Sequence, residues 1–229
     1  MPETRALNQK RIDDLVDRMP EVAVGIEDCC PDARCGLLMC AECSEDPREP
    51  YIAELRRLED MYEGPHQIAT IHLATYPAGS LDAADMKKSQ TALRKQLQRA
   101  GFKGSILVGG TEAGWSEKQC LWILHVHLLA IGAPDAAWKM LRAALRDSGP
   151  AIPLKVQPLR DVEYQISYLL KFTTCHWPKA RGPEGRGDAR PLPPDRLAEL
   201  AAFWSRYRFD DFPFLFGARR RGGLIFPEV

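Results

Sequence analysis

The sequence contains no long apolar run, and its charges cancel. No hydrophobic stretch approaches the roughly 20 residues that cross a bilayer, so we expect no membrane span. Residues 1–15 lack the apolar core of a secretory signal, and we therefore expect a cytoplasmic protein. Lys and Arg together number 31, as do Asp and Glu, so the formal net charge is zero. Such a protein has no global field that attracts nucleic acid, and any attraction must come from local clusters.

Two local clusters of basic residues are present. Both patterns are typical of a solvated surface, although either cluster could also contact nucleic acid. The first cluster lies in a predicted helix and the second lies near the C-terminus: Lys87, Lys88, Arg94, Lys95 and Arg99, and then Arg219, Arg220 and Arg221.

Five of the seven cysteines lie between Cys29 and Cys43. In a cytosolic protein, this clustering indicates a metal site rather than disulfides. Cys40 and Cys43 form a close pair that can chelate a tetrahedral ion, and Cys35 with either Cys30 or Cys29 would complete four ligands. A segment this short buries little core without metal, so we predict structural Zn²⁺ in preference to free or redox-active cysteines.

Composition divides the chain into four segments. Residues 1–63 contain a helix and the cysteine-rich, zinc-binding module, and residues 64–177 form the main domain. Residues 178–194 are rich in Pro, Gly and Arg, which predicts a flexible linker or loop. Residues 195–229 contain a last helix and a basic, aromatic tail.

The main domain alternates strand and helix patterns. This order favours an α+β fold, an antiparallel sheet of about five strands with helices covering one face. Apolar periodicity predicts strands over residues 66–76, 105–112, 120–131 and 154–159, and helices over residues 80–100, 134–147 and 161–172. Outside the main domain, it predicts helices over residues 8–19, 51–61 and 195–208.

His125 and His127 lie in the most apolar predicted strand. Side chains alternate along a strand, so both imidazoles point the same way, about 6.6 Å apart along the chain. The pair can begin a metal site, although two hydrogen-bonded core histidines would also explain it. Glu112 ends the preceding strand, and the short turn between them predicts a hairpin that brings its carboxylate beside the histidines. Such a ligand set, with open positions, suits a catalytic divalent ion.

Tyr164, Tyr168 and Lys171 lie in a predicted helix. Residues four apart share a helix face, so the tyrosines would be roughly 6 Å apart, with Lys171 one turn beyond Tyr168. A phenol has a pKa near 10 and is a poor nucleophile at neutral pH. A nearby ammonium and a metal-polarised phosphate would both help it attack. Alternatively, the tyrosines pack with Leu169 and Leu170 on an amphipathic helix.

Taken together, these motifs resemble those of the HUH endonucleases, which include rolling-circle replication initiators, transposases and relaxases. The resemblance covers residues 68–172. His125-Val126-His127 is similar to the His-hydrophobic-His motif, and Tyr168-Leu169-Leu170-Lys171 to the Tyr-x-x-Lys motif, which Tyr164 extends to the two-tyrosine form. The segment 73–77, LATYP, is similar to the shorter and less specific first motif.

The resemblance implies an RRM-like palm and a covalent mechanism. His125 and His127, with Glu112, would hold Mg²⁺ or Mn²⁺, which polarises a phosphate of single-stranded or hairpin DNA. Tyr168 would attack and leave a 5′-phosphotyrosine link and a free 3′-hydroxyl, without ATP. Tyr164 would serve a second strand transfer. Thr75, Tyr76 and the arginine run 219–221 are the candidate DNA-binding residues.

The implied function is site-specific nicking and joining that initiates plasmid or phage replication, and a transposase would use the same chemistry. The chain lacks a GxxxxGK[ST] phosphate loop, so a host helicase would be needed, and a host polymerase would extend the 3′-hydroxyl. A non-catalytic, zinc-containing nucleic-acid-binding regulator is the alternative from another class. A cupin or histidine-triad enzyme fits poorly, because residues 128–132 lack the further histidine or glutamate that these proteins need.

Overall fold

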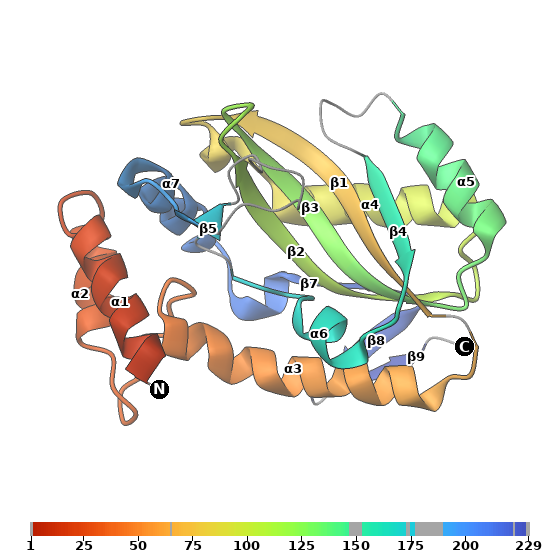
Figure 1. Ribbon diagram of the computed structural model, residues 1–229, viewed down its shortest axis with the longest axis horizontal. Coiled ribbons are helices and arrows are strands. Elements are labelled where there is room, and N and C mark those ends of the chain that lie inside the picture. The colour runs from red at the N-terminus through yellow and green to blue at the C-terminus, as the bar shows by residue number, and fades with distance from the viewer. Residues whose placement is uncertain are drawn as a thin grey trace, which may run out of the picture.

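A five-stranded antiparallel sheet lies at the centre of the molecule (Figure 1). The computed structural model describes residues 2–64, 66–146, 153–172, 175–176, 190–221 and 223–227. The strands follow the spatial order β4-β1-β3-β2-β7, and every neighbouring pair is antiparallel. Their bounds are β1, His66–Pro77; β2, Ile106–Ser116; β3, Leu121–Ile131; β4, Leu154–Pro158; and β7, Pro213–Phe216.

The three long strands form the predicted hairpin and its neighbour. A short turn joins β2 to β3, and the register pairs Glu112 with His125 and Gly110 with His127. On the other side of β3, Thr70 of β1 pairs with His127. Because paired residues on adjacent strands share a face, the carboxylate, both imidazoles and the Thr70 hydroxyl project from the same face of the sheet.

The opposite face is covered by α4, Met86–Ala100, and α5, Asp135–Ala144. The connection order is therefore β1–α4–β2–β3–α5–β4. Helix α4 begins later than the sequence predicts, because a 3₁₀ turn, η1 (Leu81–Ala83), comes first and the Asp85 side chain caps the Lys88 amide at 2.9 Å. Gly101, in the left-handed region with φ 89°, ends the helix.

Helices also cover the face that carries the histidines, so the expectation of helices on one face alone is wrong. The long helix α3, Ala41–Met61, runs along this side, with the short helix α6, Val162–Ser167, between it and β4 (Figure 1). Helix α3 buries Tyr51, Leu55 and Leu58 in the same core as Val108 and Leu129 of the sheet. The side chains on this part of the face are apolar, and α3 shields them from water.

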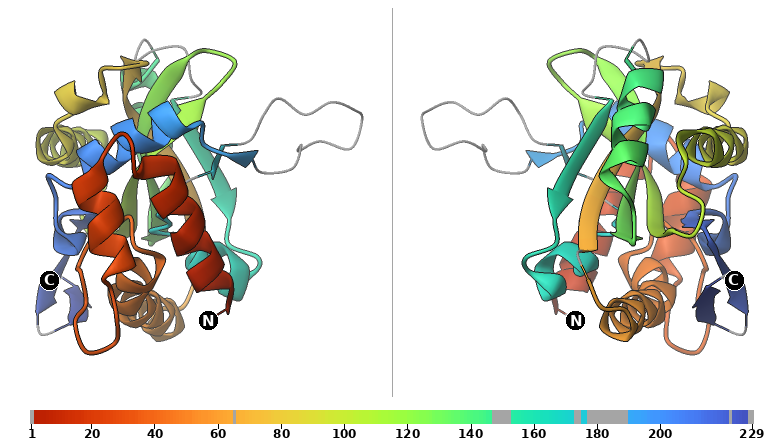
Figure 2. Two further views of the ribbon diagram at one scale, coloured as in Figure 1. Left: turned by 90° about the vertical axis from the view of Figure 1, so that its left-hand side faces the viewer. Right: turned by 90° about the vertical axis from the view of Figure 1, so that its right-hand side faces the viewer.

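The N-terminal segment forms a helical layer at one end of the molecule. Helices α1, Pro2–Leu15, and α2, Pro20–Glu27, lie side by side there (Figure 2). They precede α3, which continues from this layer underneath the sheet. The Tyr51 hydroxyl of α3 donates to the Gly109 carbonyl of β2 at 2.7 Å. The first 63 residues are thus joined to the main sheet by a shared helix.

The C-terminal segment also contributes to the main sheet. After α7, Pro194–Trp204, and the 3₁₀ turn η2, Phe209–Asp211, strand β7 pairs with β2 as an edge strand. The tail then forms a hairpin of β8, Ala218–Arg221, and β9, Leu224–Pro227. Of the predicted linker over residues 178–194, residues 178–189 lie outside the described residues, while β6, Arg190–Pro191, pairs with β5, Cys175–His176. Among the described helices, none combines the length and apolar character of a bilayer span.

Candidate active site

The site begins with two imidazoles and a carboxylate that converge on one point. Nε2 of His125 lies 3.0 Å from Nε2 of His127. The Oε2 atom of Glu112 lies 3.9 Å from each of these nitrogens. All three side chains are partly buried, with 13–16% of each exposed. The grouping predicted from the sequence is therefore present in space, and the three residues could hold a metal ion.

The outer nitrogens of both histidines are held by hydrogen bonds. Nδ1 of His125 lies 3.0 Å from the Ile123 carbonyl, which can only accept, so Nδ1 carries the proton and Nε2 presents a lone pair. Nδ1 of His127 lies 2.9 Å from the Thr70 hydroxyl, which can accept in the same way. When Thr70 accepts, two lone pairs face each other beside the Glu112 carboxyl group. A cation between them would relieve this repulsion, so the residues fit a divalent metal.

Burial shifts the pKa of each ligand. Burial lowers the pKa of His125 and lowers that of His127 further, and the mutual repulsion of the two rings adds to the second shift. Burial raises the pKa of Glu112 from 4.5 to about 8, although a hydrogen bond from Lys171 and the charges of Lys171 and Arg48 act in the opposite direction. Near neutral pH the imidazoles are therefore neutral ligands, while the carboxyl group holds a proton that a metal must displace.

We expect Mn²⁺ to stabilise the protein more at pH 8 than at pH 6. Because its folded pKa is raised, protonated Glu112 stabilises the metal-free fold at low pH, and this contribution is lost as the pH rises from 4.5 to about 8. Over the same interval, fewer protons compete with the ion. The apparent Mn²⁺ affinity should rise by up to about tenfold per pH unit and level off once the carboxyl group is ionised.

Thermal unfolding with and without Mn²⁺ at several pH values would measure this effect. The control is Glu112→Gln, which keeps the side-chain shape but cannot ionise, so its weaker Mn²⁺ response should not vary with pH in this range. An equally steep pH response in Glu112→Gln would show that another group controls binding.

The tyrosine segment lies against this group of ligands. Helix α6 starts at an Asp161 cap, whose side chain accepts from the Tyr164 amide at 3.0 Å. The helix ends at Ser167, so the predicted helix over residues 161–172 is wrong in its second half. Tyr168 is the C-cap, and Leu170 adopts a left-handed conformation with φ 70°. The chain thus turns sharply between Tyr168 and Lys171 and does not continue along a helix face.

This turn, which the sequence does not predict, brings Tyr168 and Lys171 next to the candidate ligands. The ring of Tyr168 lies edge-on to the ring of His127, with centroids 5.6 Å apart. The Lys171 amide donates to Oε1 of Glu112 at 2.5 Å, and its Nζ lies 4.7 Å from the centre of the Tyr168 ring. Tyr168 thus lies next to His127 and the Lys171 ammonium, and the Lys171 amide is bonded to Glu112. Tyr164 lies one turn back, 60% exposed, with its ring 6.3 Å from that of Tyr168.

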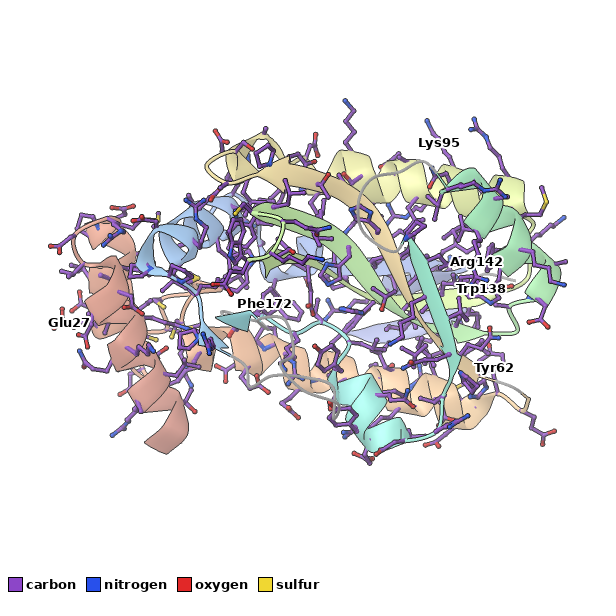
Figure 3. The ribbon with its side chains drawn as sticks, turned by 45° about the horizontal axis from the view of Figure 1, so that its top comes forward. Glu27, Tyr62, Lys95, Trp138, Arg142 and Phe172 are labelled. Carbon is purple, nitrogen blue, oxygen red and sulfur yellow. The ribbon has the colours of Figure 1, made fainter. Side chains whose placement is uncertain are left out.

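Two further features seat the turn on the sheet. A Cβ atom at Gly110 would lie 2.7 Å from the Cα of Leu170, so glycine permits the turn to pack directly on β2. After the turn, Phe172, labelled in Figure 3, packs edge-on against Trp204 and Phe212, with ring centroids 5.4 and 5.1 Å away. The turn is thus held in place by its close packing on Gly110 and by the aromatic contacts of Phe172.

A pocket of about 340 Å³ opens beside Tyr168 and His127. Its size suits a nucleotide-sized group. The amphipathic lining combines polar and apolar side chains of β1, β4, α6 and the turn after α6, including Thr70, Lys155, Gln157, Tyr164, Gln165 and Leu169. The sequence pattern did not single out Thr70 as a functional candidate. The available signal was its place two residues before His72 on β1, because residues two apart on a strand lie on the same face.

The cysteine cluster forms a second candidate metal site at the start of α3. The Sγ atom of Cys43 lies 3.5 Å from that of Cys29 and 3.6 Å from that of Cys35, and the Cys40 and Cys29 sulfurs are 3.7 Å apart. Four thiolates about 2.3 Å from a tetrahedral zinc ion are about 3.8 Å apart, which matches. Cys30 is exposed and pairs with Ala33 in an isolated bridge, so Cys29 takes the fourth position.

The thiols of this cluster differ in acidity. Burial raises the pKa of Cys29, but hydrogen bonds to the Cys35 amide and to neighbouring thiols outweigh it and bring the pKa to about 7. Burial raises the pKa of Cys43 to about 11 and raises that of Cys35 as well. A metal must therefore displace protons from the buried thiols, while Cys29 offers the first thiolate. The Asn8 amide donates to the Cys40 sulfur at 3.4 Å and supports it from α1.

The candidate DNA-binding residues are dispersed. Thr75 and Tyr76 lie at the end of β1, where Thr75 pairs with Ile123 of the central strand, and Tyr76 lines a pocket that faces α4. The run Arg219, Arg220 and Arg221 lies on β8. Arg220 is held by an ion pair with Asp210 at 2.6 Å and lies 5.7 Å from the ring centre of Tyr51, while Arg219 and Arg221 are exposed.

Comparison of the chain with models of known protein families, with curated proteins and with solved structures gave no match.

Proposed function

We propose that the protein is a metal-dependent endonuclease and strand transferase that cuts single-stranded DNA with Tyr168. One observation carries this proposal. The Tyr168 ring lies 5.6 Å from the ring of His127, whose Nε2 faces both His125 and Glu112. A phenol, a cation and three metal-ligand side chains in one half-buried site are the groups that phosphoryl transfer to a tyrosine requires.

The ligand set suits Mg²⁺ or Mn²⁺. Two imidazoles and one carboxylate, with room for substrate oxygens, favour a catalytic ion over a structural one. When bound, the ion supplies positive charge that polarises the phosphate and offsets the charge that develops on it. The Cys29, Cys35, Cys40 and Cys43 cluster holds structural Zn²⁺ in this proposal.

The residues of the chain carry out the transfer. The phenol oxygen of Tyr168 bonds to phosphorus, the bond from phosphorus to the 3′ oxygen breaks, the phenol proton leaves and the 3′ oxygen gains a proton. The products are a 5′-phosphotyrosine and a free 3′-hydroxyl. The ammonium of Lys171, 4.7 Å from the ring centre, stabilises the negative charge of the phenol oxygen as it is deprotonated. The covalent link retains the energy needed for rejoining, so no nucleotide cofactor is consumed.

Tyr164 serves the second strand transfer. Its ring lies within the same pocket wall, and its 60% exposure lets it reach a DNA strand while Tyr168 remains linked. A one-tyrosine enzyme would use Tyr168 alone and leave Tyr164 as a wall residue.

The biological role that fits best is initiation of plasmid or phage rolling-circle replication, with transposition as the alternative use of the same chemistry. The order β1–α4–β2–β3–α5–β4 with β4-β1-β3-β2 as spatial neighbours supports an RRM-like palm. Single-stranded or hairpin DNA at an origin is then the substrate, with Thr75, Tyr76 and the arginines of β8 as candidate contacts. A host helicase and polymerase would act after the nick.

Incubation with a pool of 5′- and 3′-labelled single-stranded oligonucleotides and Mn²⁺ tests the proposal. The expected result is a covalent protein–DNA adduct that carries the 3′ label, disappears with a chelator and is absent from a Tyr164→Phe, Tyr168→Phe double variant. An adduct in the double variant would exclude the tyrosine assignment. DNA binding without any adduct would favour the non-catalytic regulator.

A further inference from the structure

Arg48, on α3, lies across the turn that carries the tyrosine. Its side chain is 14% exposed. Its Nε donates to the Leu170 carbonyl at 3.0 Å, and its Nη2 donates to the Ser167 carbonyl. Its Nη1 pairs with Glu45 at 2.5 Å and with Glu49 at 3.6 Å, and these contacts fix the guanidinium from its outer side. One planar group thus binds two carbonyls of a segment that is 119 and 122 positions distant in the chain.

The two carbonyls lie directly before the two motif residues, Tyr168 and Lys171. The Ser167 carbonyl belongs to the peptide bond that enters Tyr168, and the Leu170 carbonyl belongs to the peptide bond that enters Lys171. The amide of that second peptide bond donates to Oε1 of Glu112 at 2.5 Å. The peptide group before Lys171 is therefore held at its oxygen by Arg48 and at its nitrogen by a candidate metal ligand.

The turn is poorly supported by its own backbone. A helix of six residues has few internal hydrogen bonds, and its last carbonyls have no partner within the helix. Leu170 adopts φ 70°, which is unfavourable for a residue with a Cβ atom. A bidentate guanidinium that donates to both carbonyls offsets these costs.

We propose that Arg48 is a positioning residue, which holds Tyr168 and Lys171 at the ligand group through the two carbonyls. The inference rests on the proposed function for its consequence in catalysis, but the restraint itself is a property of the fold. Lysine cannot replace arginine in this role, because a single ammonium does not span two carbonyls in a fixed plane. The N-terminal segment thereby contributes to the nuclease site through α3.

The catalytic test uses the full chain with Arg48→Ala, Arg48→Lys and the matched control Arg57→Gln. Arg57 lies on the same helix and donates to a backbone carbonyl, that of Ile225, at 2.8 Å, but it does not touch the turn. Under single-turnover conditions with saturating DNA and Mn²⁺, Arg48→Ala should form adduct about 100-fold more slowly, since misplacement of a reacting group by about 1 Å has such an effect. Arg48→Lys should also be slow, and Arg57→Gln should match the wild type.

Chemical rescue separates positioning from general destabilisation. Added ethylguanidinium should restore part of the lost rate in Arg48→Ala, and it should not accelerate Arg48→Lys or the wild type. Failure of rescue, together with an equal rate loss in Arg57→Gln, would overturn the proposal.

A second measurement does not depend on activity. Hydrogen exchange at the Lys171 amide should be slow in the wild type and at least tenfold faster in Arg48→Ala, with β2 and β3 amides unchanged and Mn²⁺ affinity retained. Unchanged exchange at Lys171 would overturn the proposal. If the wild type forms no adduct with any DNA, the proposed function fails, and the exchange result alone decides whether Arg48 restrains the turn.

Discussion

Tyr168→Phe is expected to abolish covalent adduct formation and leave single-stranded DNA binding intact. The substitution removes the phenol oxygen but keeps the ring, which packs edge-on to His127 and beneath the Lys171 ammonium. Loss of a nucleophile reduces the rate of such a reaction by on the order of 10⁴-fold or more. Denaturing gels of the enzyme with end-labelled DNA and Mn²⁺ would measure adduct yield, and filter binding would measure affinity.

Tyr164→Phe is the matched control for this experiment. Tyr164 lies on α6, whose C-cap is Tyr168, but it is 60% exposed and makes its ring contact with Tyr168 rather than with a histidine. Its loss should leave the first cleavage within a few-fold of the wild type and should suppress only joining to a second strand. The reverse pattern, with adducts lost in Tyr164→Phe and kept in Tyr168→Phe, would exchange the roles of the two tyrosines.

Cys40→Ser is expected to release zinc and to destabilise the entire chain. Cys40 is fully buried at the start of α3, and its sulfur lies 3.7 Å from that of Cys29. Loss of a structural metal is among the changes that cost more than about 4 kcal/mol. At about 2–4 °C per kcal/mol for a chain of this size, the melting temperature should fall by roughly 10 °C or more.

The zinc experiment has an internal control in Cys30. Cys30→Ser should retain one zinc per chain and the wild-type melting temperature, because this thiol is exposed and outside the cluster of four. Metal content by mass spectrometry and thermal unfolding would be measured on both variants. A Cys40→Ser protein with full zinc content and unchanged stability would exclude the cluster as a structural metal site.

Part of the site could be predicted from the sequence because its geometry is local. Alternation along one strand places His125 and His127 on the same face, and a short turn fixes which residue of the preceding strand lies beside them. The observed register, with Glu112 opposite His125, follows from these two rules. The cysteine spacing has the same local character, although it could not distinguish Cys29 from Cys30.

Other features depend on packing between distant segments. The sequence predicts a helix only over residues 51–61, after a stretch that contains Pro47 and Pro50, yet α3 begins at Ala41. Each proline removes a helical hydrogen bond at a cost of about 3 kcal/mol, and the burial of Tyr51, Leu55 and Leu58 against the sheet outweighs it. Tertiary packing therefore determined the length of this helix.

The turn after Ser167 likewise could not be predicted from the local sequence. The pattern over residues 161–172 has helical periodicity, but the helix stops because Arg48 and Glu112 bind the backbone groups that would continue it. Contacts across 59 to 122 positions leave no local pattern in the sequence. The available signal was Gly109-Gly110 within a strand, since interior strand glycines mark places where another backbone approaches closely. The four residues of β7 were likewise too few to show strand alternation.

The most direct test of the central claim is the anomalous diffraction of a Mn²⁺-soaked crystal, recorded above the manganese absorption edge. The account predicts a strong peak bonded to Nε2 of His125, Nε2 of His127 and the Glu112 carboxylate, with the Tyr168 hydroxyl facing the ion's open side. A peak elsewhere, or a Tyr168 hydroxyl directed away from the ion with the Arg48 contacts intact, would contradict it.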